Sequence, residues 1–147
     1  MGAATIGIAL VAVMWPGGER RTPARLRESH LPFGAAEQAY AANLQIENLA
    51  MKQAESFLNQ EITTLSGQIQ NAGNSSLANV EITVEFSDEL GQIVLRESRT
   101  LFSPQAAPLQ AAERRDFEVS FEHIPPSWNV QKPAVHISGI LFGAKKE

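Results

Sequence analysis

The sequence of 147 residues contains no cysteine, and this absence removes disulfides, thiolate metal sites and cysteine nucleophiles together. Basic residues are also in the minority, because 12 Lys and Arg against 16 Asp and Glu give a net charge of -4. An acidic balance gives no reason to expect nucleic-acid binding. We therefore predict that nucleic acid is not a partner.

The common motifs of catalysis and metal binding are missing as well. There is no nucleophile elbow GxSxG and no phosphate loop GxxxxGK[ST]. The three histidines, His30, His123 and His136, lack the close spacing of a metal site such as HExxH. Acidic pairs such as Glu81 and Glu85 alternate with apolar residues, as on the solvated face of a strand. We predict that the protein is not an enzyme, with no catalytic residue, metal site or cofactor.

No apolar run reaches the length of a membrane span. Ala3–Trp15 is uncharged but has only 13 residues, whereas a spanning helix needs about 20. We interpret residues 1–15 as an anchor-like segment that is short or lacks its upstream part. A signal peptide is an alternative, although no basic residue precedes the run and no clean cleavage site comes after it. A soluble helix, apolar on all sides and therefore buried, is the third interpretation.

Residues 16–39 have the composition of a linker rich in Pro, Gly and Arg. Four of its residues are Arg20, Arg21, Arg25 and Arg27, whereas the chain from Glu37 onward holds 8 basic and 14 acidic residues. The positive-inside tendency would place the chain beyond the apolar run in the cytoplasm. If a basic stretch upstream of the apolar run is missing, the balance of basic residues on its two sides would be reversed. We expect the domain on the periplasmic side of the membrane.

The remaining chain has enough apolar residues for a core, at 44% hydrophobic and 19% charged. We predict a domain over residues 40–142 and a charged tail over 143–147. Strands are expected at 40–49, 61–71, 80–86, 92–101, 115–122 and 135–141, separated by turns such as 71–76 and 88–91. Residues 50–60 have helical apolar spacing and are interpreted as a helical turn or an irregular crossover. Together these signals predict an all-β antiparallel sandwich of about seven strands.

One strand has a particularly regular pattern. Apolar residues at every second position, Val80, Ile82, Val84 and Phe86, alternate with Glu81, Thr83 and Glu85. A period of two predicts one buried and one solvated face. We therefore expect Val84 and Phe86 in the core and Glu81 and Glu85 in solvent.

The stretch "LSGQIQNAGNSSLANVEITVEFSDELGQIV", residues 65–94, resembles FxLYD-type immunoglobulin-like domains of bacterial envelope proteins. The matching residues are Gly67, Asn71, Gly73, Leu77, Val80, Ile82, Val84, Phe86, Asp88 and Gly91. The later "LQAAERRDFEVSF" matches at Leu109, Phe117 and Val119. Val84, Phe86 and Ser87 stand where the name-giving Phe, Leu and Tyr would be. The resemblance implies an immunoglobulin-like β-sandwich.

The order of apolar segment, linker and domain is similar to that of anchored proteins of acidobacterial type whose function is unknown. That family has no assigned catalytic residues. The resemblance implies a non-enzymatic module held in the cell membrane by a single-pass anchor. Its expected role is protein–protein interaction in the bacterial envelope, as an accessory subunit of a membrane protein complex with a still unidentified protein partner. The alternative is a module that binds a small ligand or a glycan.

Two aromatic residues are candidates for contact with a partner. Trp128 lies among prolines in the loop at 124–133, and Tyr40 lies at the start of the domain. Aromatic residues in loops are frequent interface anchors, but they also close the ends of sandwiches. Both interpretations apply to both residues. In the glycan alternative, Trp128 is the residue on which the ligand stacks.

Overall fold

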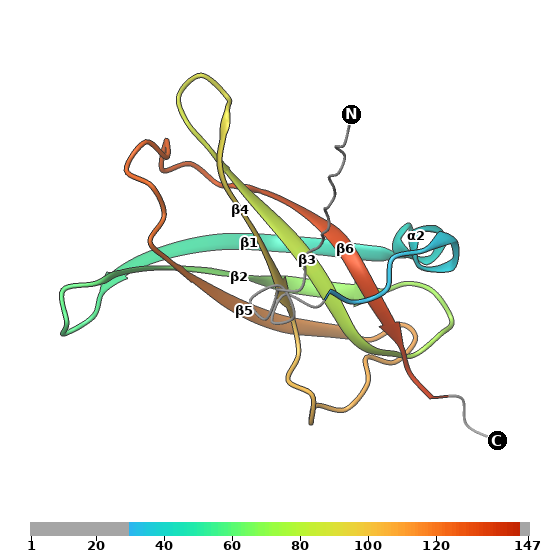
Figure 1. The fold of residues 1–147 in the computed structure, drawn as a ribbon. Coiled ribbons are helices and arrows are strands. Elements are labelled where there is room, and N and C mark those ends of the chain that lie inside the picture. The colour runs from blue at the N-terminus through green and yellow to red at the C-terminus, as the bar shows by residue number, and fades with distance from the viewer. Residues whose placement is uncertain (1–29, 145–147) are drawn as a thin grey trace, which may run out of the picture. The chain divides into compact units, whose positions relative to one another are not determined.

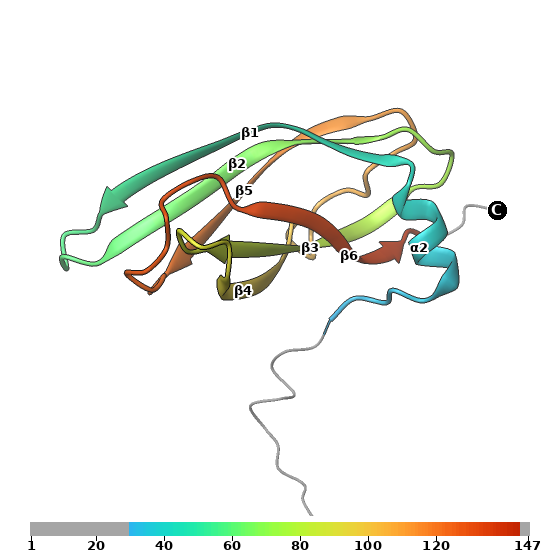
Figure 2. The ribbon, with the colours of Figure 1, turned by 90° about the horizontal axis from the view of Figure 1, so that it is seen from above.

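Six antiparallel strands form two three-stranded sheets in the computed structural model, which describes residues 30–144 (Figure 1). The strands are β1 (Leu44–Glu55), β2 (Glu61–Asn71), β3 (Leu77–Ser87), β4 (Ile93–Thr100), β5 (Arg114–Glu122) and β6 (Ala134–Phe142). One short helix, α2 (Ala35–Ala41), precedes them. The sheets have the strand orders β1-β2-β5 and β4-β3-β6 and lie in two layers (Figure 2). The predicted all-β sandwich is confirmed, with six strands in the described residues instead of about seven.

The core lies between the two sheets and follows the alternation of the strands. Val84 and Phe86 are exposed by 0% and 1%, so their predicted burial is confirmed. The ring of Phe86 packs edge-on against Phe121 of the facing sheet, with centroids 5.2 Å apart. The core residues are Leu44, Leu65, Ile69, Leu77, Val80, Ile82, Val84, Phe86, Leu101, Phe102, Leu109, Phe117, Val119, Phe121, Trp128 and Ile140.

The prediction for residues 40–60 was right only for the strand at 44–49. Tyr40 belongs to helix α2, β1 begins at Leu44, and residues 50–55 continue β1 instead of forming a helical turn. The register of β1 with β2 is complete from Ala50 to Glu55, opposite Ser66 to Glu61. Pairing along a whole strand outweighs the weak helical preference of a short segment. A bulge between Glu47 and Ala50, with φ of 58° at Asn48, shifts the register of the strand.

The compact unit begins at Leu31, inside the range predicted as linker. The Leu31 N–H donates to Oε1 of Glu81 at 2.7 Å, and the carbonyl of Pro32 accepts from the Ile140 N–H at 2.9 Å. We call residues 31–32 the strap. The predicted anchor over 1–15, the linker residues 16–29 and the tail residues 145–147 lie outside the described residues.

Glu81 was predicted to be exposed and is buried, with 3% of its surface exposed. It lies opposite Gly139 of β6. A Cβ atom at Gly139 would come within 2.8 Å of both Oε1 of Glu81 and Cβ of Leu31. The missing side chain at residue 139 therefore lets the strap and the carboxylate meet on the outer face of β3. Glu85 is partly exposed, as an ion pair with Arg96 at 2.8 Å.

A register shift in β6 reverses the alternation that the sequence predicts for this strand. Ile82 pairs with Ile137 and Glu81 with Gly139, so Ser138 is an extra residue. One extra residue moves all later side chains to the opposite face. Ile140 is therefore in the core, and Leu141, which continues the sequence alternation of Val135, Ile137 and Gly139, is 42% exposed.

A buried asparagine joins the segments at the end of the sandwich where α2 lies. Asn71 is fully buried; its Oδ1 accepts from the Tyr40 hydroxyl at 2.6 Å and its Nδ2 donates to the carbonyl of Ser75 at 2.7 Å. Its backbone N–H donates to the carbonyl of Glu113, and its carbonyl accepts from the Ala112 N–H. Gly73 is required here because a Cβ atom would overlap the Tyr40 hydroxyl.

The long connection between β4 and β5 is held by Arg115. Its guanidinium donates to the carbonyls of Ala107 and Pro108 at 2.7 and 3.1 Å and lies 4.8 Å from the ring centroid of Phe102. The Gln110 N–H and the Arg115 guanidinium both stabilise the Glu113 carboxylate and lower its pKa. This arginine therefore packs against the domain and does not lie free in solvent.

Phe86→Ala should lower the free energy of unfolding by about 3–5 kcal/mol, because it leaves a cavity between the sheets. Phe57→Ala is the matched control, since Phe57 is 95% exposed and its change should stay within about 0.5 kcal/mol. Urea unfolding of the two variants measures both values. Equal losses would contradict the described core.

Tyr40→Phe should lower the free energy of unfolding by about 1–3 kcal/mol, because it removes a hydrogen-bond donor from buried Asn71. The ring contact with Phe142, at 5.5 Å between centroids, is retained in this variant. Thermal unfolding with the wild type as reference measures the loss. An unchanged stability would show that the Asn71 network does not depend on the hydroxyl.

Candidate functional site at the loop end

Three connections lie together at one end of the sandwich, which we call the loop end (Figure 2). They join β1 to β2 at residues 56–60, β3 to β4 at 88–92 and β5 to β6 at 123–133. The Asn129 N–H donates to the carbonyl of Ser87 at 2.9 Å, and the Asn129 side chain donates to that of Asp88 at 3.2 Å. These bonds hold the last connection against the second. Helix α2 lies at the opposite end.

A hollow of about 490 Å³ opens between the β1–β2 hairpin and the β5–β6 connection. One wall is polar and consists of Gln53, Asn59, Gln60, Glu61 and Thr63. The other wall is mainly apolar and consists of His123, Ile124, Pro125, Pro126, Trp128 and Val130. The hollow therefore offers hydrogen-bonding groups along one side and apolar surface along the other.

The backbone around the hollow is strained. Asn59, His123 and Val130 have φ angles of 61°, 60° and 63°, and they are three of the five non-glycine residues with positive φ in the described chain. Asparagine tolerates this conformation, whereas a β-branched residue such as Val130 rarely adopts it. Strain of this kind concentrates at functional sites. The residues with positive φ therefore coincide with residues that line the hollow.

Large apolar side chains are exposed on the connections of the loop end. Phe57 is 95% exposed, Leu58 72%, Leu90 83% and Val130 57%. The prediction of a helical turn or an irregular crossover at 50–60 gave Phe57 and Leu58 no exposed role and so missed them. An apolar pair between Ser56 and Asn59, at the tip of a hairpin, was the signal that could have identified them.

The loop end is acidic on balance. It carries the carboxylates of Glu55, Glu61, Asp88, Glu89 and Glu122, against the side chains of Lys52 and Lys132. Gln60 donates from Nε2 to Oε1 of Glu122 at 3.2 Å, and the same Nε2 lies 3.1 Å from Nε2 of His123. Gln60 thus links the polar wall of the hollow to the end of β5.

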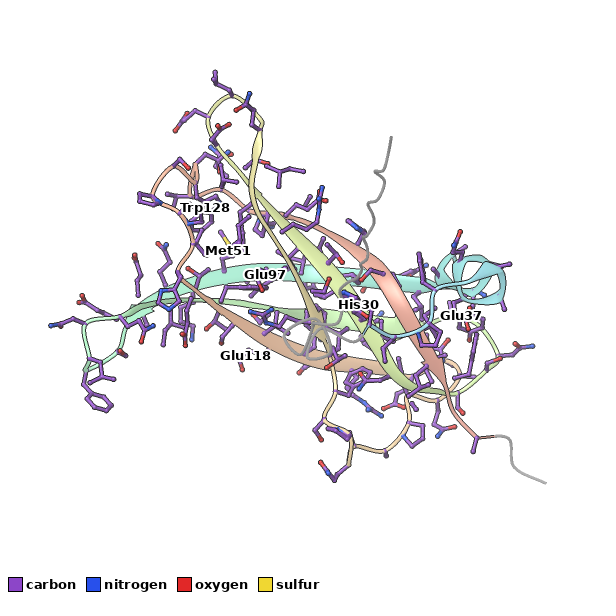
Figure 3. The ribbon with its side chains drawn as sticks, in the orientation of Figure 1. His30, Glu37, Met51, Glu97, Glu118 and Trp128 are labelled. Atoms are coloured by element: carbon purple, nitrogen blue, oxygen red, sulfur yellow. The ribbon has the colours of Figure 1, made fainter. Side chains whose placement is uncertain are left out.

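Trp128 is 7% exposed and belongs to the core. Its ring meets Phe86 edge-on at 5.3 Å, and its Nε1 donates to the carbonyl of Gln131 at 3.2 Å. Figure 3 shows Trp128 on the β5–β6 connection. The structure therefore places this residue at the end of the sandwich, where it closes the core and contributes a small part of its surface to the hollow. Contact with a partner remains a prediction for it.

Tyr40, the other candidate contact, lies at the α2 end and is partly exposed. Its hydroxyl bonds Asn71 and accepts from the Ser75 N–H at 3.0 Å. The structure does not bring Tyr40 and Trp128 together. A partner contact through Tyr40 also remains a prediction.

Residues 30–144 contain no group of three or more His, Asp or Glu side chains arranged to hold a metal ion. Within the same range no helix is both long and apolar enough to cross a membrane. Comparisons of the chain with protein-family models, with curated proteins and with solved structures find no match.

Val130→Gly should raise the free energy of unfolding by up to about 1 kcal/mol, because glycine adopts positive φ without steric cost. Val135→Gly is the matched control within β6 and should lower it, since the same change there weakens a strand. Urea unfolding of both variants tests the conformation of Val130. A loss of stability in Val130→Gly similar to that of the control would contradict the described strain.

Proposed function

We propose that the protein is a non-enzymatic, immunoglobulin-like interaction module of the bacterial envelope that binds a partner protein through its loop end. The FxLYD resemblance supports the immunoglobulin-like assignment. A single-pass anchor over residues 1–15, with the domain on the periplasmic side, completes the proposal. Its role is that of an accessory subunit of a membrane protein complex.

One observation carries the proposal. The strained backbone, the hollow and the exposed apolar side chains all lie at the same end of the sandwich. Exposed Phe and Leu residues at a hairpin tip lower solubility unless a partner covers them. Binding residues are commonly found on loops that a rigid sandwich holds in position.

The position of the strap agrees with this role. The strap and α2 pack near the end of β6, away from the three connections of the loop end. A chain that is attached to a membrane upstream of Leu31 would leave the loop end free to reach a partner. The hollow thus lies on the part of the domain that a partner protein could reach most easily.

A small ligand or a glycan is the second candidate, and the polar wall of the hollow favours it. The amide groups of Gln53, Asn59 and Gln60 can donate and accept hydrogen bonds to sugar hydroxyls. Stacking on Trp128 is less favourable than the sequence suggested, because Phe86 and the core cover most of the indole. We therefore place the protein partner first.

Photo-crosslinking tests the proposed function in native membranes. p-Benzoylphenylalanine replaces Phe57 or Leu90 at the loop end of the full chain, and Leu141, an exposed apolar residue of β6, is the control. We expect one discrete crosslinked protein from Phe57 and Leu90 and none from Leu141. Protease added to intact spheroplasts should digest the domain if it lies on the periplasmic side.

Equal crosslinking from all three positions would contradict a specific loop-end interface. Absence of any crosslinked protein, together with saturable binding of an oligosaccharide, would favour the second candidate. Protection of the domain until the membrane is lysed would refute the periplasmic placement.

A further inference from the structure

Within residues 30–144, the half of β1 nearest the loop end has backbone groups without a hydrogen-bond partner. The backbone N–H and C=O of Asn71 face β5, because they bond Glu113 and Ala112. The backbone N–H and C=O groups of successive residues point alternately to the two sides of a strand. Those of the even-numbered residues of β2 therefore point toward β1, and those of their partners Ala50, Lys52 and Ala54 point toward β2. The N–H and C=O groups of Met51, Gln53 and Glu55 therefore point away from the sheet. Residues 30–144 provide no hydrogen-bond partner for these groups.

The other three edges have features that oppose strand addition. On β4, the ion pair of Glu97 and Arg99 at 2.8 Å lies on the inner face, with the guanidinium 4.7 Å from the ring centroid of Phe121. On β6, the strap occupies the edge at Ile140. On β5, charged side chains alternate along the exposed face, namely Arg114, Asp116, Glu118 and Glu122. Charges that point inward and covered edges are the common protections against pairing.

On β1 a bulge at Glu47 to Ala50 interrupts the ladder only in the first half, and the second half carries one charged side chain on its outer face, Lys52. From Ala50 to Glu55 its register is regular. In Figure 3 Met51 lies on β1 on the side of Trp128, whereas Glu118 lies on β5, which is the other edge of this sheet. This regular half-strand thus lies beside the β5–β6 connection.

The hollow lies on the inner face next to this edge. Gln53 lines the hollow, and its partner Thr63 is buried on the same inner face. Directly opposed residues on neighbouring strands share a face of the sheet. A residue that paired with Gln53 from outside would therefore direct its side chain toward Pro125, Pro126 and Val130. Main-chain bonds from an edge, combined with a pocket for an alternate side chain, are the basis of recognition by strand addition.

We propose that the β1 edge from Met51 to Glu55 accepts an extended segment of the partner protein as an added strand, with one side chain of that segment in the hollow. The proposal rests on the proposed function and specifies how its partner is bound. The apolar wall favours an apolar side chain in the hollow. The carboxylates of Glu55 and Glu61, which lie near Gln53, favour Lys or Arg beside it. The segment we expect is therefore extended, apolar at its centre and basic at its flanks.

Displayed peptides provide the probe. The full chain in detergent micelles is used to select from a library of random twelve-residue peptides, and the consensus peptide is synthesised for titration. Gln53→Pro removes an edge N–H without removing a bond to β2, because proline is tolerated where the N–H faces outward. Ser120→Pro is the matched control, since the backbone groups of Ser120 point outward from the β5 edge by the same alternation.

We expect Gln53→Pro to raise the Kd of the consensus peptide at least tenfold and Ser120→Pro to change it less than twofold. Backbone amide exchange of the unmodified chain provides a readout that does not depend on either variant folding. The peptide should slow exchange at Met51, Gln53 and Glu55 at least tenfold and leave Ser120 unchanged.

Four results would overturn the proposal: no enriched peptide, equal effects of the two proline variants, protection confined to other strands, or a second copy of the chain bound at this edge. Crosslinks from Phe57 in native membranes, with peptide binding insensitive to Gln53→Pro, would reject strand addition but keep the loop-end interface. Absence of both crosslinks and peptides would reject the proposed function as well.

Discussion

The buried amide of Asn71 is the constraint on which one end of this sandwich depends. A side chain with no exposed surface must find partners for its donors and its acceptor, and Asn71 finds them in α2, the β2–β3 turn and the β4–β5 connection. Three segments that are distant in sequence are thereby held in one geometry. The loop end has no comparable buried hub among the described residues, and its connections are free to combine exposed apolar side chains with unusual backbone angles.

The sequence was sufficient to predict strands whose side chains simply alternate between the core and solvent. The alternation of β5 places Phe117, Val119 and Phe121 inside, as the structure shows. The failures depend on contacts that are distant in sequence. Glu81 is buried because Gly139 and Leu31 approach it, and Leu141 is exposed because of the extra residue Ser138. No local pattern contains the positions of these partners.

The candidate site was less accessible to sequence reasoning than the fold. Trp128 was identified as an unusual loop residue, and one of its two interpretations, the closing of the sandwich, agrees with its burial. The hollow combines β1, β2 and the β5–β6 connection, and its existence depends on where the hairpin and that connection meet in space. The positive φ of Val130 has no signal in the sequence, since valine does not normally adopt it.

The strap determines how a mechanical load would enter the domain. A pull on the chain upstream of Leu31 would load the hydrogen bonds from Leu31 to Glu81 and from Ile140 to Pro32 before it reaches the ladder of β1. These two bonds lie on the outer face and edge of one sheet, while the hydrophobic core lies behind them. Their rupture would release only the short stretch up to α2, which the Tyr40–Asn71 bond retains. A load on the chain upstream of Leu31 would thus act through a contact that can yield before any strand separates.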